Sequence, residues 1–377
     1  MSKVAVVRTP VDYSDVEAAV RTAVKLCDGE AVLSGVVGRQ VLVKPNLVET
    51  NDGESGNTTD KRIIGALVKM AIERGAVVTV GDSGGTRWHG ATDLALKETG
   101  MREYCEHLGA EVASFDKTEP VKIEIHNGTV LKEAYLASPA IEASFIINAP
   151  KMKTHILTKT TGAVKNLFGC VPGGLKSVYH KTGGDSVRFA SLLVDIYSVL
   201  TPGLTVMDGV VGLSGPWRLQ DRIYPGVILA GTDGVAVDAV AARILGFNPM
   251  HVPILADAHR RGLGVATLDK ITLVGEPLAP IVEAVSGKTK RWRAPSFGNS
   301  VGGWALGKES PELIEGDCTG CGHCPQACPV GAVVLKDGRP EFDLDKCIRC
   351  FCCAELCPKR AIRLTRGRFL NLFIKRD

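Results

Sequence analysis

The sequence predicts two folded units: an α/β domain built on a mostly parallel sheet with flanking helices, and a small α+β domain after it. Two observations carry this prediction. Strand-like and helix-like segments alternate through residues 1–285, and nine of the 12 cysteines gather after residue 317. Alternating strands and helices favour a parallel sheet covered by helices, whereas clustered cysteines in a cytosolic chain more often hold metal than disulfides.

The predicted strands are short apolar runs, and the predicted helices repeat apolar residues at intervals of three and four positions. The strands are expected at Val4–Val7, Gln40–Pro45, Ala76–Val80, Ser144–Asn148, Leu204–Asp208 and Val227–Ala230. The helices are expected at Asp15–Leu26, Asp60–Arg74, Arg188–Leu200 and Val235–Leu245.

These patterns divide the chain into four segments. The α/β domain is predicted at residues 1–285, and residues 286–312 are predicted as a linker because they lose periodicity and are rich in Gly, Ser and basic residues. Residues 313–366 form the cysteine-rich domain, and residues 367–377 form a basic and apolar tail. The tail is expected to close the cysteine-rich domain or pack on the α/β domain; docking on a membrane surface or a partner is the alternative.

The clustered cysteines fall into two runs of one pattern, C-x-x-C-x-x-C-x-x-x-C-P, which begin at Cys318 and Cys347. Thiolates suit iron–sulfur clusters, and two-residue gaps let a tight loop place three ligands around one cubane. Zinc ribbons also use paired C-x-x-C motifs, but they lack the further cysteines and the proline. The segment resembles the bacterial ferredoxins that hold two [4Fe–4S] clusters, and this resemblance implies electron transfer.

In this pattern the fourth cysteine of each run binds the cluster of the other run. One cluster is therefore assigned to Cys318, Cys321, Cys324 and Cys357, and the other to Cys347, Cys350, Cys353 and Cys328. Cys352 interrupts the repeat beside Cys353. It is expected to be a spectator, although a sulfur at this position could tune the cluster or exchange with a ligand. Purely structural clusters are the alternative to electron transfer.

Polar residues follow four of the predicted strands at the point where each strand ends. They are Lys44-Pro45-Asn46, Asp82-Ser83, Asn148–Lys151 and Asp208-Gly209. Ligands of open α/β sheets usually bind beyond the carboxyl ends of the strands. These residues therefore predict one site at that edge of the sheet.

The segment Asn148–Lys176 gathers lysines and glycines after an apolar strand. Lysines and the backbone amides of glycine-rich turns form concavities that bind anions. The site is predicted to hold an anionic small molecule with Lys44, Lys151, Lys153, Lys165 and Lys176, oriented by Asn46 and Asn166, with Asp82 and Asp208 at its edge. For each lysine taken alone, a solvated side chain is the alternative.

Titratable residues near this segment suggest further chemistry. His155 is predicted to move a proton, in a catalytic group with Lys165 and Asn166, whereas His180 and Cys170 are expected to be structural. Asp82, Asp208 and Asp238 each flank an apolar run, so two or more of them could meet and bind Mg²⁺. Turn formation or helix capping is the alternative, above all for Asp238.

A set of motifs between Val4 and Val274 is specific when taken together: KPN, GDSGG, NAPKMKTH, TGAVKNLFG, MDGVVGLSG and GTDGVAVDAVAARILG. In these motifs the chain resembles the family called domain of unknown function 362, whose members often carry a C-terminal ferredoxin module. The resemblance supports the α/β fold and implies no particular reaction.

The formal net charge is +4, from 45 basic and 41 acidic residues, which is too small to predict nucleic-acid binding. No apolar run reaches the length of about 18 residues that a transmembrane helix needs. The first residues lack the apolar stretch and cleavage site of a signal peptide. The protein is therefore expected in the cytoplasm.

Three functions are compatible with these features. The first is an oxidoreductase that passes electrons from the clusters to an anionic small molecule or cofactor, and it is favoured because one chain links the site to the clusters. The second is an electron carrier whose α/β domain recognises a protein that donates or accepts electrons. The third is a non-redox enzyme that depends on Mg²⁺ and phosphate and carries structural or sensing clusters.

Overall fold

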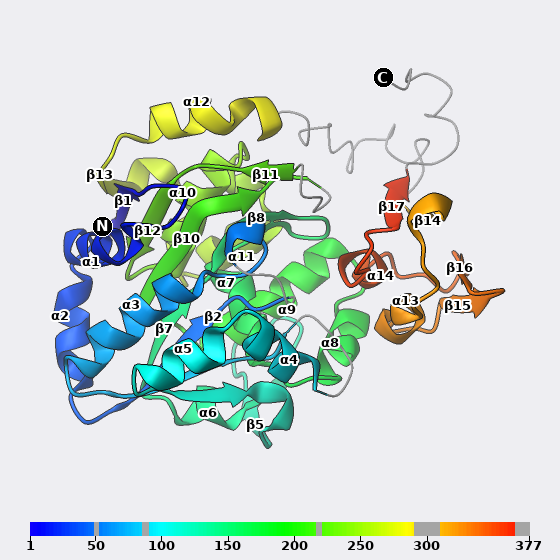
Figure 1. Cartoon of the computed structure of the whole chain (residues 1–377), viewed down its shortest axis with the longest axis horizontal. Helices are drawn as coiled ribbons and strands as arrows, with labels where there is room; N and C mark the ends of the chain where they lie inside the picture. Colours follow the sequence, from blue (N-terminus) through cyan, green and yellow to red (C-terminus); the bar gives the residue numbers. More distant parts are fainter. Residues whose placement is uncertain (49–52, 85–89, 216–220, 290–309, 366–377) are drawn as a thin grey trace.

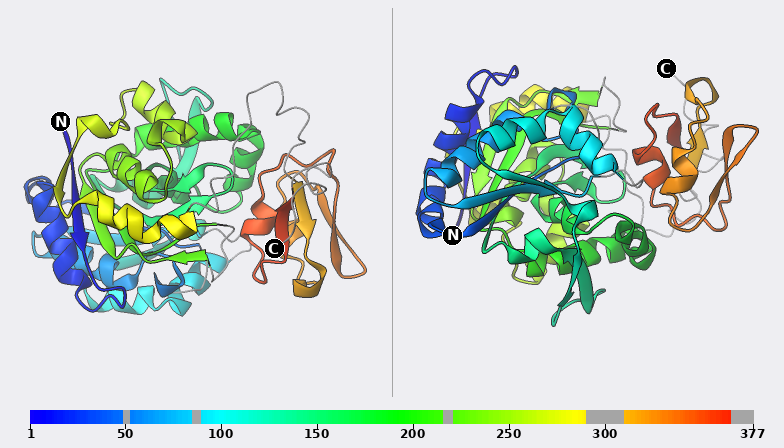
Figure 2. Two further views of the ribbon diagram at one scale, coloured as in Figure 1. Left: turned by 90° about the horizontal axis from the view of Figure 1, so that it is seen from above. Right: turned by 60° about the horizontal axis from the view of Figure 1, so that its bottom comes forward.

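The computed structural model describes residues 1–48, 53–84, 90–215, 221–289 and 310–365. Most of the chain forms an α/β unit around a central sheet, and the cysteine-rich segment forms a small unit beside it (Figure 1). Two further views place the small unit against the same end of the α/β unit (Figure 2). Within the described residues, no helix is long and apolar enough to cross a membrane.

The central sheet is mixed and mostly parallel, which confirms the predicted fold class. Its main path runs β13-β1-β12-β10-β7-β2-β3-β4, and the steps from β10 to β4 are all parallel. Along this path through the described residues, antiparallel pairing enters only where β12 joins β10 to β1. The bounds are β1 (Ser2–Arg8), β2 (Gln40–Pro45), β3 (Val77–Asp82), β4 (Glu111–Ser114), β7 (Phe145–Ala149), β10 (Leu204–Leu213), β12 (Val227–Gly231) and β13 (Ile271–Gly275).

Helices cover both faces of the sheet because side chains alternate along each strand. In β2, Val41 and Val43 pack into one apolar core with α1 and α3, whereas Leu42 packs into another with α9 and α11. A third core joins β1 and β12 to α10 and α12. The longer helices are α1 (Val16–Leu26), α3 (Lys61–Ile72), α4 (Ala91–Glu98), α8 (Leu175–Gly183), α9 (Ser186–Val199), α10 (Gly234–Ile244), α11 (Pro253–Arg260) and α12 (Leu278–Thr289).

All the predicted strands and helices are present, and their ends are set by local chemistry. β2 has the predicted bounds, and α3 begins after Asp60, whose carboxylate accepts a hydrogen bond from the backbone N–H of Arg62. β3 extends two residues beyond the predicted end, to Asp82. β10 extends to Leu213 because its second half pairs with β8 (Lys151–His155) and β11 (Arg222–Ile223).

The small unit contains two antiparallel strand pairs and two short helices. Strand β14 (Ser310–Leu313) pairs with β17 (Ile362–Thr365), and β15 (Val333–Lys336) pairs with β16 (Arg339–Phe342). The helices are α13 (His323–Ala327) and α14 (Cys352–Glu355). Ile156 of the α/β unit packs against the apolar core of the small unit.

Regular structure enters the predicted linker from both sides. α12 continues to Thr289, and β14 lies at Ser310–Leu313 because it completes the small sheet with β17. The middle of the linker, residues 290–309, and the predicted tail, residues 367–377, lie outside the described residues.

Candidate functional site

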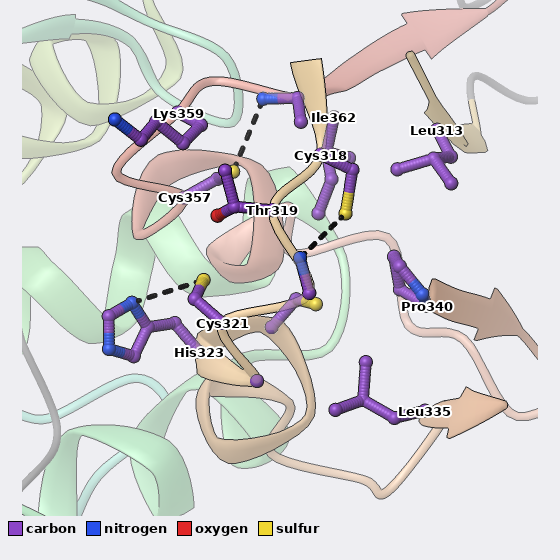
Figure 3. A pocket seen from close by; sticks show the side chains of 14 residues that line it. Leu313, Cys318, Thr319, Cys321, His323, Leu335, Pro340, Cys357, Lys359 and Ile362 are labelled. Carbon is purple, nitrogen blue, oxygen red and sulfur yellow. Dashed lines mark hydrogen bonds between the residues drawn. The ribbon is translucent and has the colours of Figure 1, made fainter. Parts of the chain in front are cut away.

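The four cysteines assigned to the first cluster line one cavity (Figure 3). Cys318 and Cys321 come from the loop before α13, Cys324 from α13 itself, and Cys357 from the end of the second run. The cavity measures about 340 Å³ including its open part. Burial raises the pKa of the Cys324 thiol to about 11, and the nearby Cys357, Cys321 and Cys318 reinforce that shift. Thiols that converge in this way suit a metal cluster, whose binding would displace their protons.

The second set of cysteines is also gathered in space. Burial raises the pKa of Cys353, and Cys350, Cys347, Cys328 and Cys324 reinforce the shift. The pKa of Cys347 is raised mainly by burial too, with Cys350 and Cys328 as its cysteine neighbours. The fourth cysteine of the first run therefore lies beside the second set, which is the crossed arrangement that the sequence predicts.

The two cysteine runs fold alike, with different residues at corresponding positions. The first run has left-handed backbone at Gly320, Gly322 and Gly331. The second run repeats this conformation at Arg349, Phe351 and Arg360, with φ of 56°, 56° and 52°. For a residue other than glycine, the left-handed backbone conformation costs about 1–2 kcal/mol. The runs also share a backbone hydrogen bond to sulfur, because Ala332 N–H donates to Cys328 Sγ over 3.1 Å and Ala361 N–H to Cys357 Sγ over 3.2 Å.

A cleft lies where the α/β unit meets the small unit. It measures about 610 Å³ including its open part. Five of the predicted site residues line it: Asn46, Asp82, Lys165, Asn166 and Lys176. The small unit contributes Cys352 and Leu356. Since α14 carries both Cys352 and the predicted cluster ligand Cys353, the cleft and the second set of cysteines share a helix.

The floor of the cleft is set by the parallel strands, as the sequence predicts. Asn46 follows β2, Asp82 ends β3 and Asn148 lies in the neighbouring β7, where it pairs with Lys44 in register. The fully buried Lys44 places its Nζ 2.7 Å from Asp82 Oδ1. Asp82 Oδ2 accepts the Leu47 N–H over 2.7 Å. Lys44 thus supports the cleft from beneath and is not among its lining residues.

Two lysines give the cleft its positive charge. Lys165 is half-buried in α7 (Ala163–Asn166) and has no hydrogen-bond or ion-pair partner in the described part of the chain. Lys176 donates to the carbonyls of Ser83 and Gly84 and to Ser83 Oγ, so it holds the loop after β3. Burial lowers the pKa of Lys176 to about 8, while Asp82 and Asp116 oppose the shift.

This lowered pKa predicts that the cleft loses affinity for anions as the pH rises. Lys176 is charged below about pH 8 and neutral above it, so the attraction is present at low pH and is lost through that value. We expect sulfate, whose own charge is constant in this range, to bind about tenfold more weakly at pH 9 than at pH 7. Calorimetric titration measures this. The Lys176→Met variant should bind sulfate weakly at every pH, with no fall in affinity near pH 8. An unchanged fall in affinity in that variant would exclude Lys176 as its cause.

Besides Lys44, four predicted site residues do not reach the cleft: Lys151, Lys153, His155 and Asp208. The sequence suggested glycine-rich turns after β7, but Lys151–His155 forms β8, which pairs with β10 and is buried throughout. Lys151 Nζ lies 2.7 Å from Asp208 Oδ2 and donates to the Tyr13 hydroxyl over 2.8 Å. Lys153 donates to Asn57. His155 Nδ1 accepts the N–H groups of Leu157 and Thr158.

The three carboxylates considered for Mg²⁺ have separate partners. Asp82 faces Lys44, Asp208 faces Lys151, and Asp238 accepts the N–H groups of Ala163 and Val164 at the start of α7. In the described ranges no three His, Cys, Asp or Glu side chains gather as they would around a single metal ion. The ligands of a cubane bind different iron atoms and need not converge on one point.

Among the cleft residues that were not predicted as site residues, His180, Thr161 and Cys352 carry groups that can donate protons or bind a ligand. His180 stacks on Phe189 with ring centres 4.4 Å apart and forms a T-shaped contact with Phe168. Thr161 ends β9 (Lys159–Thr161), and Cys352 was expected to be a spectator. His180 lies four residues after Lys176, the last residue of the segment that was predicted to bind the anion. In a helix this spacing places both side chains on one face, so His180 could have been found by extending that segment along α8.

The fold and the gathered cysteines together define an iron–sulfur protein with an attached α/β domain. The 4Fe–4S dicluster domain matches residues 311–358, so this part of the chain is a 4Fe–4S cluster-binding domain. The domain of unknown function named DUF362 matches residues 41–243, more than half of the chain, and the chain belongs to this family.

Two individual proteins are similar to this chain. The thylakoid-associated protein sll1697 of Synechocystis is 27% identical over 260 residues, which cover 68% of this chain and 77% of that protein. The lactate racemase apoprotein of Thermoanaerobacterium thermosaccharolyticum matches with a TM-score of 0.45 and 9% identity, over 66% of this chain. The chain spans 58% of that racemase, less than two thirds of its length.

Proposed function

We propose that the protein is an oxidoreductase in which two [4Fe–4S] clusters exchange electrons with an anionic small molecule bound in the cleft. The main support for this proposal is that residues of both units line one cleft, among them Lys165 from the α/β unit and Cys352 from the small unit. When bound, the clusters would each supply or accept one electron. Their proposed ligands are the two sets of four cysteines, Cys318, Cys321, Cys324, Cys357 and Cys347, Cys350, Cys353, Cys328.

The residues of the α/β unit would bind and orient the anion. Lys165 offers an ammonium group without a protein partner in the described chain. Lys176 adds charge and fixes the loop after β3. His180 lines the same cleft and is the proposed proton carrier, since an imidazole titrates near neutral pH; it takes the role that the sequence suggested for His155.

The proposal is tested by comparing Lys165→Ala with Lys181→Ala. Lys181 is exposed on α8 and does not line the cleft, so its loss should change nothing. Loss of Lys165 removes a charge-assisted contact and should weaken anion binding by about 10-fold to 100-fold. Protein purified without oxygen is analysed by mass spectrometry for bound small anions, which should be present in Lys181→Ala and depleted in Lys165→Ala.

The redox part is tested with the same two variants. The clusters are reduced, excess reductant is removed, and the visible absorbance of the clusters is followed after adding the anion that co-purifies. An anion that accelerates reoxidation in Lys181→Ala but not in Lys165→Ala supports the proposal. If the clusters respond equally with and without the anion, the exchange of electrons with the cleft is excluded.

A second candidate is an electron carrier whose α/β unit only recognises a partner. Exposed apolar side chains on the hairpin of β15 and β16 favour it: Val334 and Leu335 are 57% and 42% exposed. Such side chains suit contact with a protein that donates or accepts electrons. Cluster reduction by that protein with no effect of any small anion would favour this candidate.

A further inference from the structure

We infer that the ligand of the cleft is a small anion that carries a hydrogen-bond donor, a hydroxyl or an amine, next to its charged group. The inference deepens the proposed function, and it rests on the part of it in which the cleft binds an anion. Its basis is a chain of three buried asparagine amides that ends at the cleft.

The amide chain begins at backbone carbonyls, which can only accept hydrogen bonds. Asn148 Nδ2 donates to the carbonyl of Ala163 over 2.9 Å, and Asn166 Nδ2 donates to the carbonyls of Lys44 and Pro45 over 3.2 Å. These contacts fix the orientation of both amides. The two orientations are consistent with each other, because in these orientations Asn166 Nδ2 donates to Asn148 Oδ1 over 2.7 Å.

The orientation then passes to the residue in the cleft. Since its nitrogen faces the carbonyls, Asn166 presents Oδ1 to Asn46, which must donate through Nδ2 over 3.0 Å. Asn46 Oδ1 therefore points away from Asn166 and remains an acceptor for other contacts, beside the second N–H of Asn46 Nδ2. This oxygen is buried and has no hydrogen-bond partner among the described residues, and the residue is only 8% exposed.

A buried acceptor without a partner costs about 1–3 kcal/mol, so a bound group that donates to Asn46 Oδ1 would gain that energy. Thr161 Oγ1, also buried and without a partner in the described chain, lines the same cleft. Lys165, beside them, can donate but not accept. The cleft thus combines a cation, a fixed acceptor and a hydroxyl, and its complement is an anion with an adjacent donor.

The test uses pairs of anions that differ by one hydroxyl: glycolate and acetate, 2-hydroxybutyrate and butyrate, 2-hydroxyethyl phosphate and ethyl phosphate. Binding to the oxidised, cluster-loaded protein is measured by calorimetry without oxygen. We expect the hydroxylated member of the carboxylate or of the phosphate pairs to bind about tenfold more tightly. If only the carboxylate pairs show this tenfold difference in affinity, the charged group of the ligand is a carboxylate; if only the phosphate pair shows it, the group is a phosphate. Equal binding within every pair, or no binding of any, overturns the inference.

Variants separate the donor contact from the charge. Asn46→Ala should reduce the ratio within a pair to about one, and Thr161→Val should lower it. Lys165→Ala should weaken both members of a pair alike and leave the ratio unchanged. A ratio that survives in Asn46→Ala overturns the assignment to Asn46, and wild-type ratios decide the question if that variant does not fold. Because binding is measured without electron transfer, donor-selective binding with unresponsive clusters would reject only the redox proposal.

Discussion

Replacing Cys353 by serine should remove one cluster, whereas replacing its neighbour Cys352 by serine should remove none. Both thiols are buried in α14, at 7% and 3% exposure, so the two changes are closely matched. They differ in position: Cys353 lies beside Cys350, Cys347 and Cys328, and Cys352 lines the cleft. Iron should fall from about eight to about four atoms per chain in Cys353→Ser only.

Iron and sulfide analysis of protein purified without oxygen measures this difference, and electron paramagnetic resonance of the reduced protein counts the remaining clusters. Equal iron loss in both variants would mean that Cys352 also serves as a ligand. Full iron content in Cys353→Ser would show that Cys352 can replace it. Either result would refute the assignment of Cys352 as a spectator of cluster binding.

Replacing Gly169 by alanine should destabilise the α/β unit by about 3–5 kcal/mol, the usual cost of breaking a buried ion pair. A methyl group at this position would overlap Asp82 Oδ1 and lie 2.6 Å from Lys44 Nζ. Both side chains are almost fully buried and pair over 2.7 Å. Neither can move away without leaving a charge unpaired in the interior.

Gly174 is the matched control, because it is open on all sides and has φ of −61°, which alanine adopts without strain. Gly174→Ala should change the free energy of unfolding by less than about 1 kcal/mol, in the stabilising direction. Urea denaturation of both variants measures the difference. Similar free energies for the two would show that the Lys44–Asp82 pair relaxes around the added methyl group.

The sequence was sufficient where local pattern determines structure. The strand Gln40–Pro45 was predicted with its observed bounds, because an apolar run ends at a proline. The crossed grouping of the cysteines followed from a repeated spacing. Asn46 and Asp82 also lie together at one edge of the sheet. This was expected, because Asn46 follows the end of β2 and Asp82 is the last residue of the parallel strand β3.

Pairing between distant residues was the part that could not be predicted. Lys151 and Lys153 looked like anion ligands because they lie in a segment that gathers lysines and glycines after an apolar strand. Their role depends on β8 aligning with β10, which buries Lys151 against Asp208, 57 positions away. His180 shares a face of α8 with Lys176, but its stacking on Phe189 of α9 is a contact between two helices that no local pattern encodes. The same holds for the pairing of Lys151 with Asp208.

The left-handed residues of the two cysteine runs imply an order of assembly. In the first run glycines adopt this backbone readily, so the loop from Cys318 to Cys324 is suited to receive iron as soon as it folds. In the second run Arg349 and Phe351 oppose the same shape, and metal ligation together with the burial of Phe351 must hold it. Iron should therefore enter the first run first and leave the second run first. The second cluster, whose proposed ligand Cys353 shares α14 with the cleft residue Cys352, would be the last to mature. Under the proposed function, a half-assembled chain could not yet exchange electrons with what the cleft binds.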